Sequence, residues 1–531
     1  MATTHKRSRT GCWTCREAGY KCDEQKPFCG RCTRLKIVCK GYGVKLKWLD
    51  DAVSTLAKPP RKSRKKKAAV MEKEEEAFSP SSSSIISFAS TPALQMQSPE
   101  GTTSSSSTIT SPQSAKSMPL LPLRSSPELS YGLSHDDRWL LTYWVDQLSL
   151  LISVAPRTGV PTPFQRHLTA MAYEFSALRS TILSMAANHL AASSNASSLY
   201  LQAYRHQRDA IRELQRMIQE PEEMNLEPAL ATVMMMQVSS RLFGDEDEVH
   251  VANHLTGAKA MIARRSAAGG DAHLSSSSLR FLTSLFAYHD ILSSVSRGSQ
   301  PLLNHYTPDL FPAVEGEQDL KSIADVLLVV ARISNLQHVI KARWAAEPFS
   351  PPLTEEENTM GRCIQQMLLA MDFNFTATTT TTTSDQPYQH DKNTDIAATA
   401  EAYRHAAFIY LYRTWLDIGA PNPISMEHIS QCLTHLEQVD VKSPLTAAHV
   451  WPLFTAGCEA VEGGQRAFVM RRFEELWRAK RFPNLRRVAR DVEVVWRAKD
   501  GEMGRKGEGG MAKVDCIQVI LRGRGREVGL V

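Results

Sequence analysis

The chain has 531 residues, of which 42% are hydrophobic and 22% charged, with a net charge of +6. This length accommodates two or three domains and one large core. No apolar run is long enough to span a membrane, so we expect no membrane partner. The first 67 residues hold nineteen Lys/Arg and five Asp/Glu and carry +14, which leaves −8 for the remainder. A basic head on a mildly acidic body predicts that only the head contacts a polyanion.

Six of the ten cysteines form one stretch near the start, Cys12-x2-Cys15-x6-Cys22-x6-Cys29-x2-Cys32-x6-Cys39. The same half-motif therefore occurs twice. Two intervening residues let a pair of thiolates face one ion, and six residues give about a turn and a half of helix, which returns the third thiolate to the metal. Zinc takes four ligands and each half offers three, so six thiolates serve two zinc ions only if two of them bridge.

Two alternatives to the zinc interpretation stay open at this point. A disulfide framework would need an oxidising compartment, yet only Lys6, Arg7 and Arg9 precede the cysteines in place of a signal peptide. A one-ion or redox site is the other alternative. The remaining cysteines are far apart in apolar or mixed contexts and are predicted to be buried thiols of a reducing compartment: Cys363, Cys432, Cys458 and Cys516.

The cysteine spacing, with the connector Lys26-Pro27-Phe28 before Cys29, resembles the fungal zinc binuclear cluster family of DNA-binding domains over residues 1–48. The resemblance implies a small domain with two short helices and two zinc ions per chain, in which Cys12 and Cys29 bridge. One zinc would be bound by Cys12, Cys15, Cys22 and Cys29, and the other by Cys29, Cys32, Cys39 and Cys12.

The resemblance also implies that the first helix, Arg16 to Lys21, reads DNA. Ala18 and Gly19 stand where the family usually has basic residues, so we expect weaker reading of its usual CGG triplet. The predicted DNA contacts are Arg16, Lys21, Lys26, Arg31 and Arg34, the last three on phosphates. The alternative for any one of them is a solvated surface charge.

The runs Gly11-Cys12-Trp13-Thr14-Cys15-Arg16-Glu17 and Gly41-Tyr42-Gly43-Val44-Lys45-Leu46-Lys47-Trp48 resemble a subgroup that includes the acriflavine-sensitivity control protein of filamentous fungi. Control of drug-response or secondary-metabolite genes is implied by that resemblance alone. Within the second run, residues 44–48 alternate apolar and basic side chains in the manner of a strand.

Residues 49–133 are predicted to be a disordered linker, because the Ser/Thr/Pro-rich part from Ser79 to Pro127 has too little apolar area to bury. A basic run within 58–67 predicts binding of a nuclear import receptor or of DNA phosphate, through Lys58, Arg61, Lys62, Arg64, Lys65, Lys66 and Lys67. Pro59 follows Val53 and Leu56 so closely that no coiled-coil heptads form, and monomeric or dimeric binding stays open.

Residues 134–500 are predicted to be an all-α domain, beginning at the N-cap Ser134, with a disordered insertion at about 372–395 and a Gly/Arg-rich tail over 501–531. This body resembles the fungal-specific transcription factor domain in motifs such as Tyr403-Arg404-His405-Ala406 and Trp451-Pro452-Leu453-Phe454.

No enzymatic site is predicted. His254, His289 and His405 are interpreted as core or groove histidines and Met234 to Met236 as core filler, and the chain has no nucleophile elbow or phosphate loop. We therefore predict a DNA-binding regulator of RNA polymerase II transcription in a fungal nucleus, acting with the transcription machinery or co-regulators. The alternative is a zinc-cluster protein that has lost sequence reading and acts through protein contacts or non-specific DNA binding.

Overall fold

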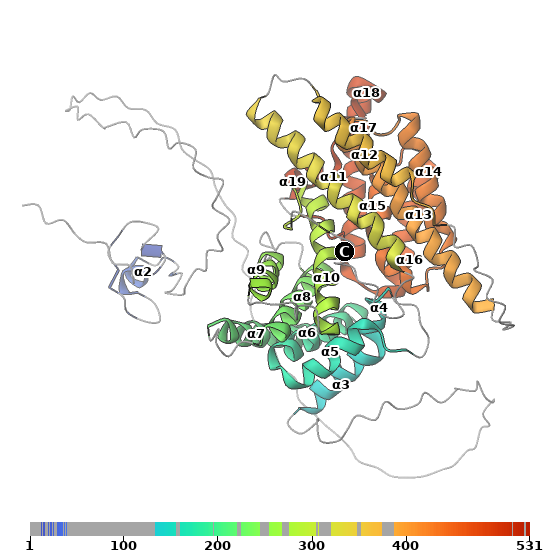
Figure 1. The fold of residues 1–531 in the computed structure, drawn as a ribbon. Helices are drawn as coiled ribbons and strands as arrows, with labels where there is room; N and C mark the ends of the chain where they lie inside the picture. The colour runs from blue at the N-terminus through green and yellow to red at the C-terminus, as the bar shows by residue number, and fades with distance from the viewer. Residues whose placement is uncertain are drawn as a thin grey trace, which may run out of the picture. The chain divides into compact units, whose positions relative to one another are not determined.

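The structure is a computed structural model of the chain (Figure 1). It describes residues 12, 14, 15, 20, 22, 23, 25, 29–35, 37 and 39 of the head, and residues 133–154, 160–194, 196–219, 225–244, 254–267, 276–303, 306, 320–347, 352–373, 387–511, 513–524 and 527–530 of the body. The chain divides into two compact units, residues 1–116 and 117–531, and each is described by itself.

The head is organised around its cysteines rather than around an apolar core. Its second half forms the short helix α2 (Gly30–Arg34), in which the Cys29 side chain accepts a hydrogen bond from the Cys32 backbone N–H. In the first half, Thr14 and Cys15 are helical. A helix as short as α2 has little stability of its own, so the thiol cluster against which it packs must hold it in place.

The body is built from helices, and its described residues contain no strand, as the sequence predicts. The N-terminal helices are α3 (His135–Tyr143), the π-helix η2 (Trp144–Leu148), α4 (Ser149–Leu151), α5 (Pro163–Glu174), α6 (Ser176–Ser194), α7 (Ser197–Gln219), α8 (Leu226–Phe243), α9 (His254–Ala267) and α10 (Ser277–Arg297). The later ones are α11 (Lys321–Ala346), α12 (Glu355–Leu369), α13 (Pro387–Trp415), α14 (Pro423–Gln438), the 3-10 helix η5 (Pro444–Ala448), α15 (Val450–Glu459), α16 (Gly463–Lys480), α17 (Pro483–Lys506), α18 (Glu508–Met511) and α19 (Cys516–Arg524).

Side-chain caps fix where several helices begin. Ser134 accepts a hydrogen bond from the Asp137 N–H at the start of α3, which confirms the predicted N-cap. Thr162 with Gln165 forms a reciprocal capping box at the start of α5. Thr354 forms the same kind of box at the start of α12. These caps satisfy backbone N–H groups that would otherwise lack partners.

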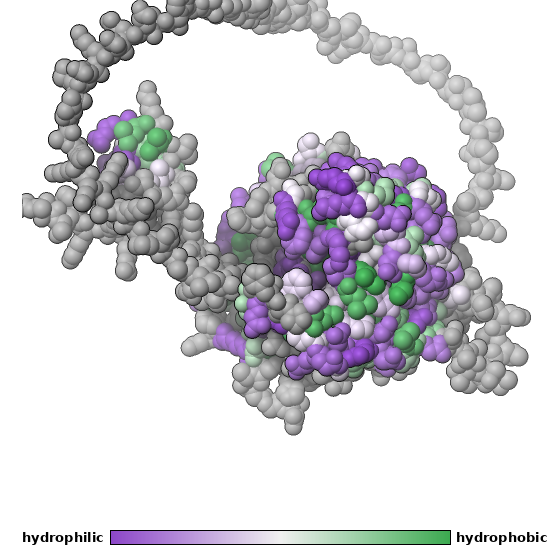
Figure 2. Space-filling view, turned by 90° about the horizontal axis from the view of Figure 1, so that it is seen from above, coloured by the Kyte–Doolittle hydropathy of each residue, from purple (hydrophilic) through white to green (hydrophobic). Residues whose placement is uncertain are grey.

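A single apolar core runs through the body. Helices α3 to α7 lie across its lower end in Figure 1, and α11 to α17 stand above them, with α11, α13 and α14 side by side. The largest fully buried side chains include Trp144, Phe286, Tyr403, Phe408 and Trp451. Polar side chains cover most of the face of this unit seen in Figure 2, and apolar residues form small patches there.

Helix α11 is by length and composition long enough to cross a membrane, which the sequence analysis did not anticipate. Half of its most apolar window is buried inside the body. Ile323, Val326, Val330 and Ile333 are buried, and the helix packs on α10, α12 and α13. Its apolar character is therefore explained by its place in the core.

Two predicted boundaries of the body are wrong. Helix α13 begins at Pro387, inside the segment predicted to be a disordered insertion. The predicted tail contains α18 and α19, and Ile520, Val528 and Leu530 are each at most 2% exposed within the core. The many Gly and Arg residues of this segment made its apolar residues hard to recognise in the sequence, and α19 packs on α17.

Candidate metal centre and DNA-binding head

The six predicted zinc ligands come together in the head. Cys12, Cys15, Cys22, Cys29 and Cys32 are buried and Cys39 packs against them. One sulfur from each of Cys12, Cys15, Cys29 and Cys32 lies within 4.8 Å of the other three. None of the ten cysteines forms a disulfide. This donor set, thiolates alone in a compact group, is the one that structural zinc sites use.

Cys12 and Cys29 occupy the middle of the group. Their Sγ atoms lie 3.5 Å apart, and Cys29 Sγ lies 3.7 Å from Cys15 Sγ while Cys12 Sγ lies 3.8 Å from Cys32 Sγ. Each of the two central cysteines thus contacts cysteines of both halves. A bridging ligand requires such a position, and the assignment of Cys12 and Cys29 as bridges stays a prediction.

In the absence of metal, the two central thiols hold their protons. Burial raises the pKa of the Cys12 and Cys29 thiols above the ordinary value. Without metal these groups would remain neutral thiols, and zinc binding would replace their protons. Bound zinc would also supply the folding free energy that so small a domain lacks in its core.

Asp23 ties the two halves of the cysteine motif together, and the sequence analysis did not identify it. Its Oδ1 accepts a hydrogen bond from the Gly30 N–H at 3.0 Å, and its Oδ2 accepts one from the Arg31 N–H at 3.1 Å. A carboxylate at a helix N-terminus satisfies free N–H groups. The signal available in the sequence was an acidic residue directly after Cys22.

Arg31 is held in place rather than free on the surface. Its guanidinium lies 4.0 Å from the centroid of the Tyr20 ring, and its Nη1 lies 3.8 Å from Cys15 Sγ. Tyr20 is 61% exposed and carries this cation on its ring. Arg34, one turn further along α2, is exposed. The predicted DNA contacts Arg16, Lys21 and Lys26 lie outside the described residues, as do the basic run 58–67 and residues 44–48.

Histidines form a second polar cluster, in the body. His405 lies with His428, its Nδ1 at 2.8 Å from the Nδ1 of that residue, and its Nε2 lies 3.9 Å from a Glu401 oxygen. Glu401, His405 and His435 could together hold a metal ion. The same Glu401 oxygen is also 2.7 Å from the Arg404 guanidinium, which competes with any cation there.

Other expectations for the body are confirmed or corrected by burial. His289 is 2% exposed, and Met234 to Met236 are buried in α8, so both are core residues as predicted. Cys432 and Cys458 are buried, but Cys363 is exposed and Cys516 is only partly buried. The prediction of four buried thiols is therefore wrong for two of them, because their positions on α12 and α19 face partly outward.

Comparison with protein families matches both units. Residues 10–49 match the fungal Zn(2)-Cys(6) binuclear cluster domain, and residues 139–527 match the fungal specific transcription factor domain. The chain belongs to the fungal zinc-cluster transcription factors. This factor is therefore a DNA-binding transcription regulator with two zinc ions per chain, and not an enzyme.

Curated relatives of the zinc-cluster factor match over short stretches of the chain. The chain is 56% identical over 45 residues to the pestheic acid cluster transcriptional regulator 3 of Pestalotiopsis fici, which is 8% of each chain. It is 58% identical over 38 residues to the sterol uptake control protein 2 of Candida albicans, which is 7% of this chain and 5% of that protein. It is 51% identical over 39 residues to the arginine metabolism regulation protein II of Saccharomyces cerevisiae, which is 7% of this chain and 4% of that protein. The alignments thus span less than a tenth of these relatives, and no solved structure matches.

Proposed function

We propose that this factor acts in the nucleus and binds duplex DNA through its cysteine head, with discrimination that differs from reading of a CGG triplet. One observation carries the proposal. Ala18 and Gly19 replace basic residues that the family usually places in its first helix, and neither side chain has a donor for guanine O6 or N7, the most common specific contact.

Phosphate contacts then supply most of the affinity. The head is strongly basic, since its first 67 residues carry +14 and two zinc ions with six thiolates change this by only −2. Arg31 and Arg34 stand on α2, and Arg16 and Lys21 flank the altered positions in the sequence. Affinity that depends mainly on phosphate contacts falls steeply as the salt concentration rises, because the release of counterions from DNA into a more concentrated salt solution is less favourable.

The genes under control are proposed to belong to a secondary-metabolite or drug-response set. The name of the pestheic acid cluster regulator supports this, as does the resemblance of the head to the acriflavine-sensitivity subgroup. The similarity to that regulator covers 8% of this chain, so it leaves the signal that reaches the body unspecified.

The second candidate function is DNA or protein binding without sequence reading. Glu17 favours this second function, because its acidic side chain lies beside Ala18 and Gly19 in the sequence and would repel DNA phosphate. The exception would be a Glu17 carboxylate that accepts a hydrogen bond from the amino group of a cytosine. Selection of bound duplexes from a randomised pool by the zinc-loaded full chain separates the two functions. An enriched site with a defined half-site spacing supports the first, whereas a pool that stays random supports the second.

A titration on CGG and scrambled duplexes at two salt concentrations tests the role of the first helix. We expect wild type to bind both with similar affinity, and the double variant Ala18→Lys, Gly19→Lys to gain about 1–3 kcal/mol per good base contact on CGG. The Cys12→Ala variant, with its metal sites disrupted, is the matched control. A strong, salt-insensitive preference of wild type for CGG would contradict the proposal.

A further inference from the structure

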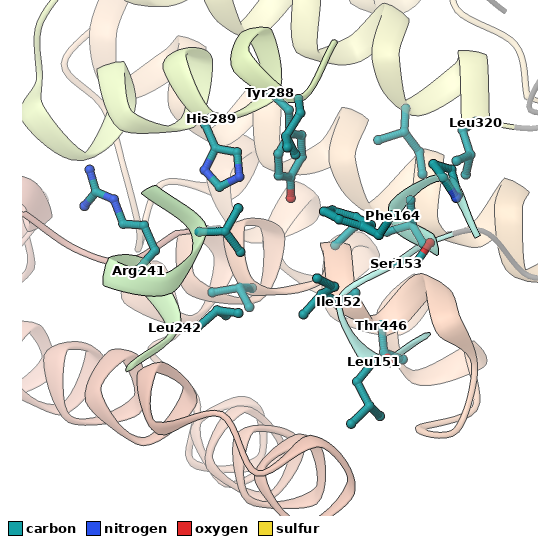
Figure 3. Close-up of a pocket in the computed structure, with 18 of the residues that line it drawn as sticks. Leu151, Ile152, Ser153, Phe164, Arg241, Leu242, Tyr288, His289, Leu320 and Thr446 are labelled. Atoms are coloured by element: carbon teal, nitrogen blue, oxygen red, sulfur yellow. The ribbon is translucent and has the colours of Figure 1, made fainter. Parts of the chain in front are cut away.

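A pocket of about 250 Å³ lies where the N-terminal and C-terminal helices of the body meet. Its wall is mainly apolar and includes Phe164 of α5, Leu242 of α8, Leu327 of α11 and Phe482 at the start of α17. Figure 3 shows Tyr288 and His289 entering it from α10, opposite Phe164 and Ile152. An apolar cavity of roughly 150 Å³ is already enough to hold benzene, so this one accommodates a ligand of one or two rings or a chain of similar size.

Lys480, at the end of α16, introduces a positive charge into this apolar wall. It is 6% exposed, and its Nζ donates a hydrogen bond to the Leu151 carbonyl at 3.2 Å. Among the described residues no carboxylate lies within 4.0 Å of it. Burial lowers the pKa of Lys480 to about 8, which leaves the ammonium form predominant at neutral pH.

The other basic residues of the pocket wall have acidic partners. Arg241 pairs with Glu527 at 2.5 Å, and Lys321, at 65% side-chain exposure, lies 3.8 Å from Asp325. Buried cations are normally paired in this way, because an unpaired charge away from water is costly. Lys480 is the exception in this wall.

The position of Lys480 is fixed by a chain of buried hydrogen bonds. The His189 Nε2–H donates to the Lys480 backbone carbonyl at 2.7 Å, and the His189 Nδ1 accepts from the Tyr143 hydroxyl at 2.7 Å. Burial lowers the pKa of His189, which keeps the ring neutral and in this tautomer. The lysine is thus held at the wall before any ligand arrives, which reduces the ordering cost of binding.

His289 contributes a second polar group to the pocket. The His289 Nδ1 is buried and has no hydrogen-bond partner among the residues that the structure describes, in a side chain that is 2% exposed. Burial and then the charge of Arg241 lower the pKa of His289 to about 3, so this imidazole is neutral. It offers one uncharged hydrogen-bonding position in addition to the ammonium of Lys480. A mainly apolar wall with few polar groups is the usual composition of small-molecule sites.

We propose that this pocket binds a small apolar carboxylic acid, with its carboxylate at Lys480 and its ring or chain between Phe164, Leu327 and Phe482. The ligand would give Lys480 a counter-charge that none of the described residues provides. Such a site inside the helical body would let a metabolite act on the transcription factor. Binding of the ligand to this pocket does not depend on which genes the factor controls.

The test uses the zinc-loaded full chain and two probes of one shape, 1-naphthoate and the uncharged 1-naphthamide, in calorimetric titrations. We expect wild type to bind naphthoate roughly tenfold or more tightly than naphthamide, the factor that a hydrogen bond to a charged group supplies. Lys480→Met removes the charge while keeping an apolar chain, so it should bind both probes equally. Lys480→Arg should keep the preference for naphthoate.

Two further variants separate ligand loss from misfolding. Ala324→Trp is expected to fill the pocket and to abolish binding of both probes, while Lys506→Met, an exposed lysine on α17, should behave as wild type. Thermal unfolding verifies that each variant is folded. Equal affinity of wild type for the two probes, a preference that persists in Lys480→Met, or no saturable binding to folded wild type would overturn the proposal. DNA selection by the same samples is scored separately, so a failure of DNA reading is distinguishable from a failure of this site.

Discussion

The Asp23 carboxylate and the Gly30 backbone N–H, 3.0 Å apart, join the two halves of the cysteine motif. A Cβ on Gly30 would lie 2.6 Å from Asp23 Oδ2, so any other residue at this position would displace the carboxylate. Each half holds three cysteines, so the two halves must remain together for six thiolates to share two ions. The hydrogen bond adds a link between protein groups to the link that shared zinc ions would provide.

Gly30→Ala should weaken zinc retention by the head. The new methyl group pushes the Asp23 carboxylate away from α2, and losing such a cap costs about 0.5–2 kcal/mol. Titration of the full chain with a zinc chelator measures the change as a lower chelator concentration at half release. Ile37→Ala, a change at a 42% exposed position of the same unit, is the control. A midpoint for Gly30→Ala equal to that of the control would show that Asp23 does not couple the halves.

Replacement of a bridging cysteine should remove both zinc ions, whereas replacement of a terminal ligand should affect one. Cys12 and Cys29 contact cysteines of both halves, so we expect Cys12→Ala or Cys29→Ala to leave less than one zinc per chain. Cys15→Ala should retain about one. Elemental analysis of purified chains gives these ratios directly. One zinc per chain in the wild type would exclude the bridged arrangement.

Spacing made the head predictable, since the two-residue and six-residue gaps between cysteines restrict how thiolates can surround a metal. Asp23 was not predicted, because a lone acidic residue after Cys22 has no periodicity and acts through backbone groups of another segment. The contact of Arg31 with Tyr20 was not predicted for the same reason, because folding of the head brings these two distant residues together.

In the body, apolar periodicity predicted the helices but not always the face that each one buries. Tyr200, Tyr204 and Ile211 repeat at helical spacing, and α7 does form there, yet these side chains are 46%, 73% and 42% exposed. The helix packs instead through small residues such as Ala203 and Ala210. The pocket was unpredictable for a related reason, since Phe164, Leu327 and Lys480 are far apart in the chain and meet only when the helices pack.

Arg34→Gln should weaken DNA binding without loosening the head. Arg34 is exposed on α2, so its loss removes one phosphate contact and lowers the slope of log affinity against log salt by about 1. Arg31→Gln should lower the slope as well and also ease zinc release, because Arg31 contacts Tyr20 and Cys15. Affinity titrations at several salt concentrations, paired with chelator titrations, separate the two effects. An unchanged slope in Arg34→Gln would remove Arg34 from the interface.

The basic run within residues 58–67 should direct nuclear import. Replacing Lys65, Lys66 and Lys67 by Ala removes three of its seven charges, and import receptors bind such runs by charge. A fluorescent fusion of the variant should stay in the cytoplasm, while the control Lys45→Ala, Lys47→Ala should enter the nucleus. If the first variant still accumulates there, import depends on basic residues of the head.

Glu459 should make the body sensitive to acid. It is 1% exposed, accepts two hydrogen bonds from the Arg413 guanidinium at 2.8 Å, and lies 2.7 Å from Lys499 Nζ. Burial alone would raise the pKa of Glu459, but Lys499 and Arg413 outweigh it and bring the pKa to about 2. The folded state therefore binds this proton less readily than the unfolded chain, whose Glu pKa is about 4.3. The stabilisation is complete above that value and is lost as the pH falls towards 2.

Glu459→Gln should destabilise the body by about 3–5 kcal/mol at neutral pH, because Arg413 and Lys499 remain buried without their counter-charge. Thermal unfolding of the full chain, followed by far-UV circular dichroism, measures the loss, and the exposed Glu462→Gln is the matched control. Below a pH of about 4 the difference between wild type and Glu459→Gln should shrink, since acid protonates the wild-type carboxyl as well. A variant that melts at the wild-type midpoint at neutral pH, or a difference that stays constant into acid, would mean that the buried charges are compensated elsewhere.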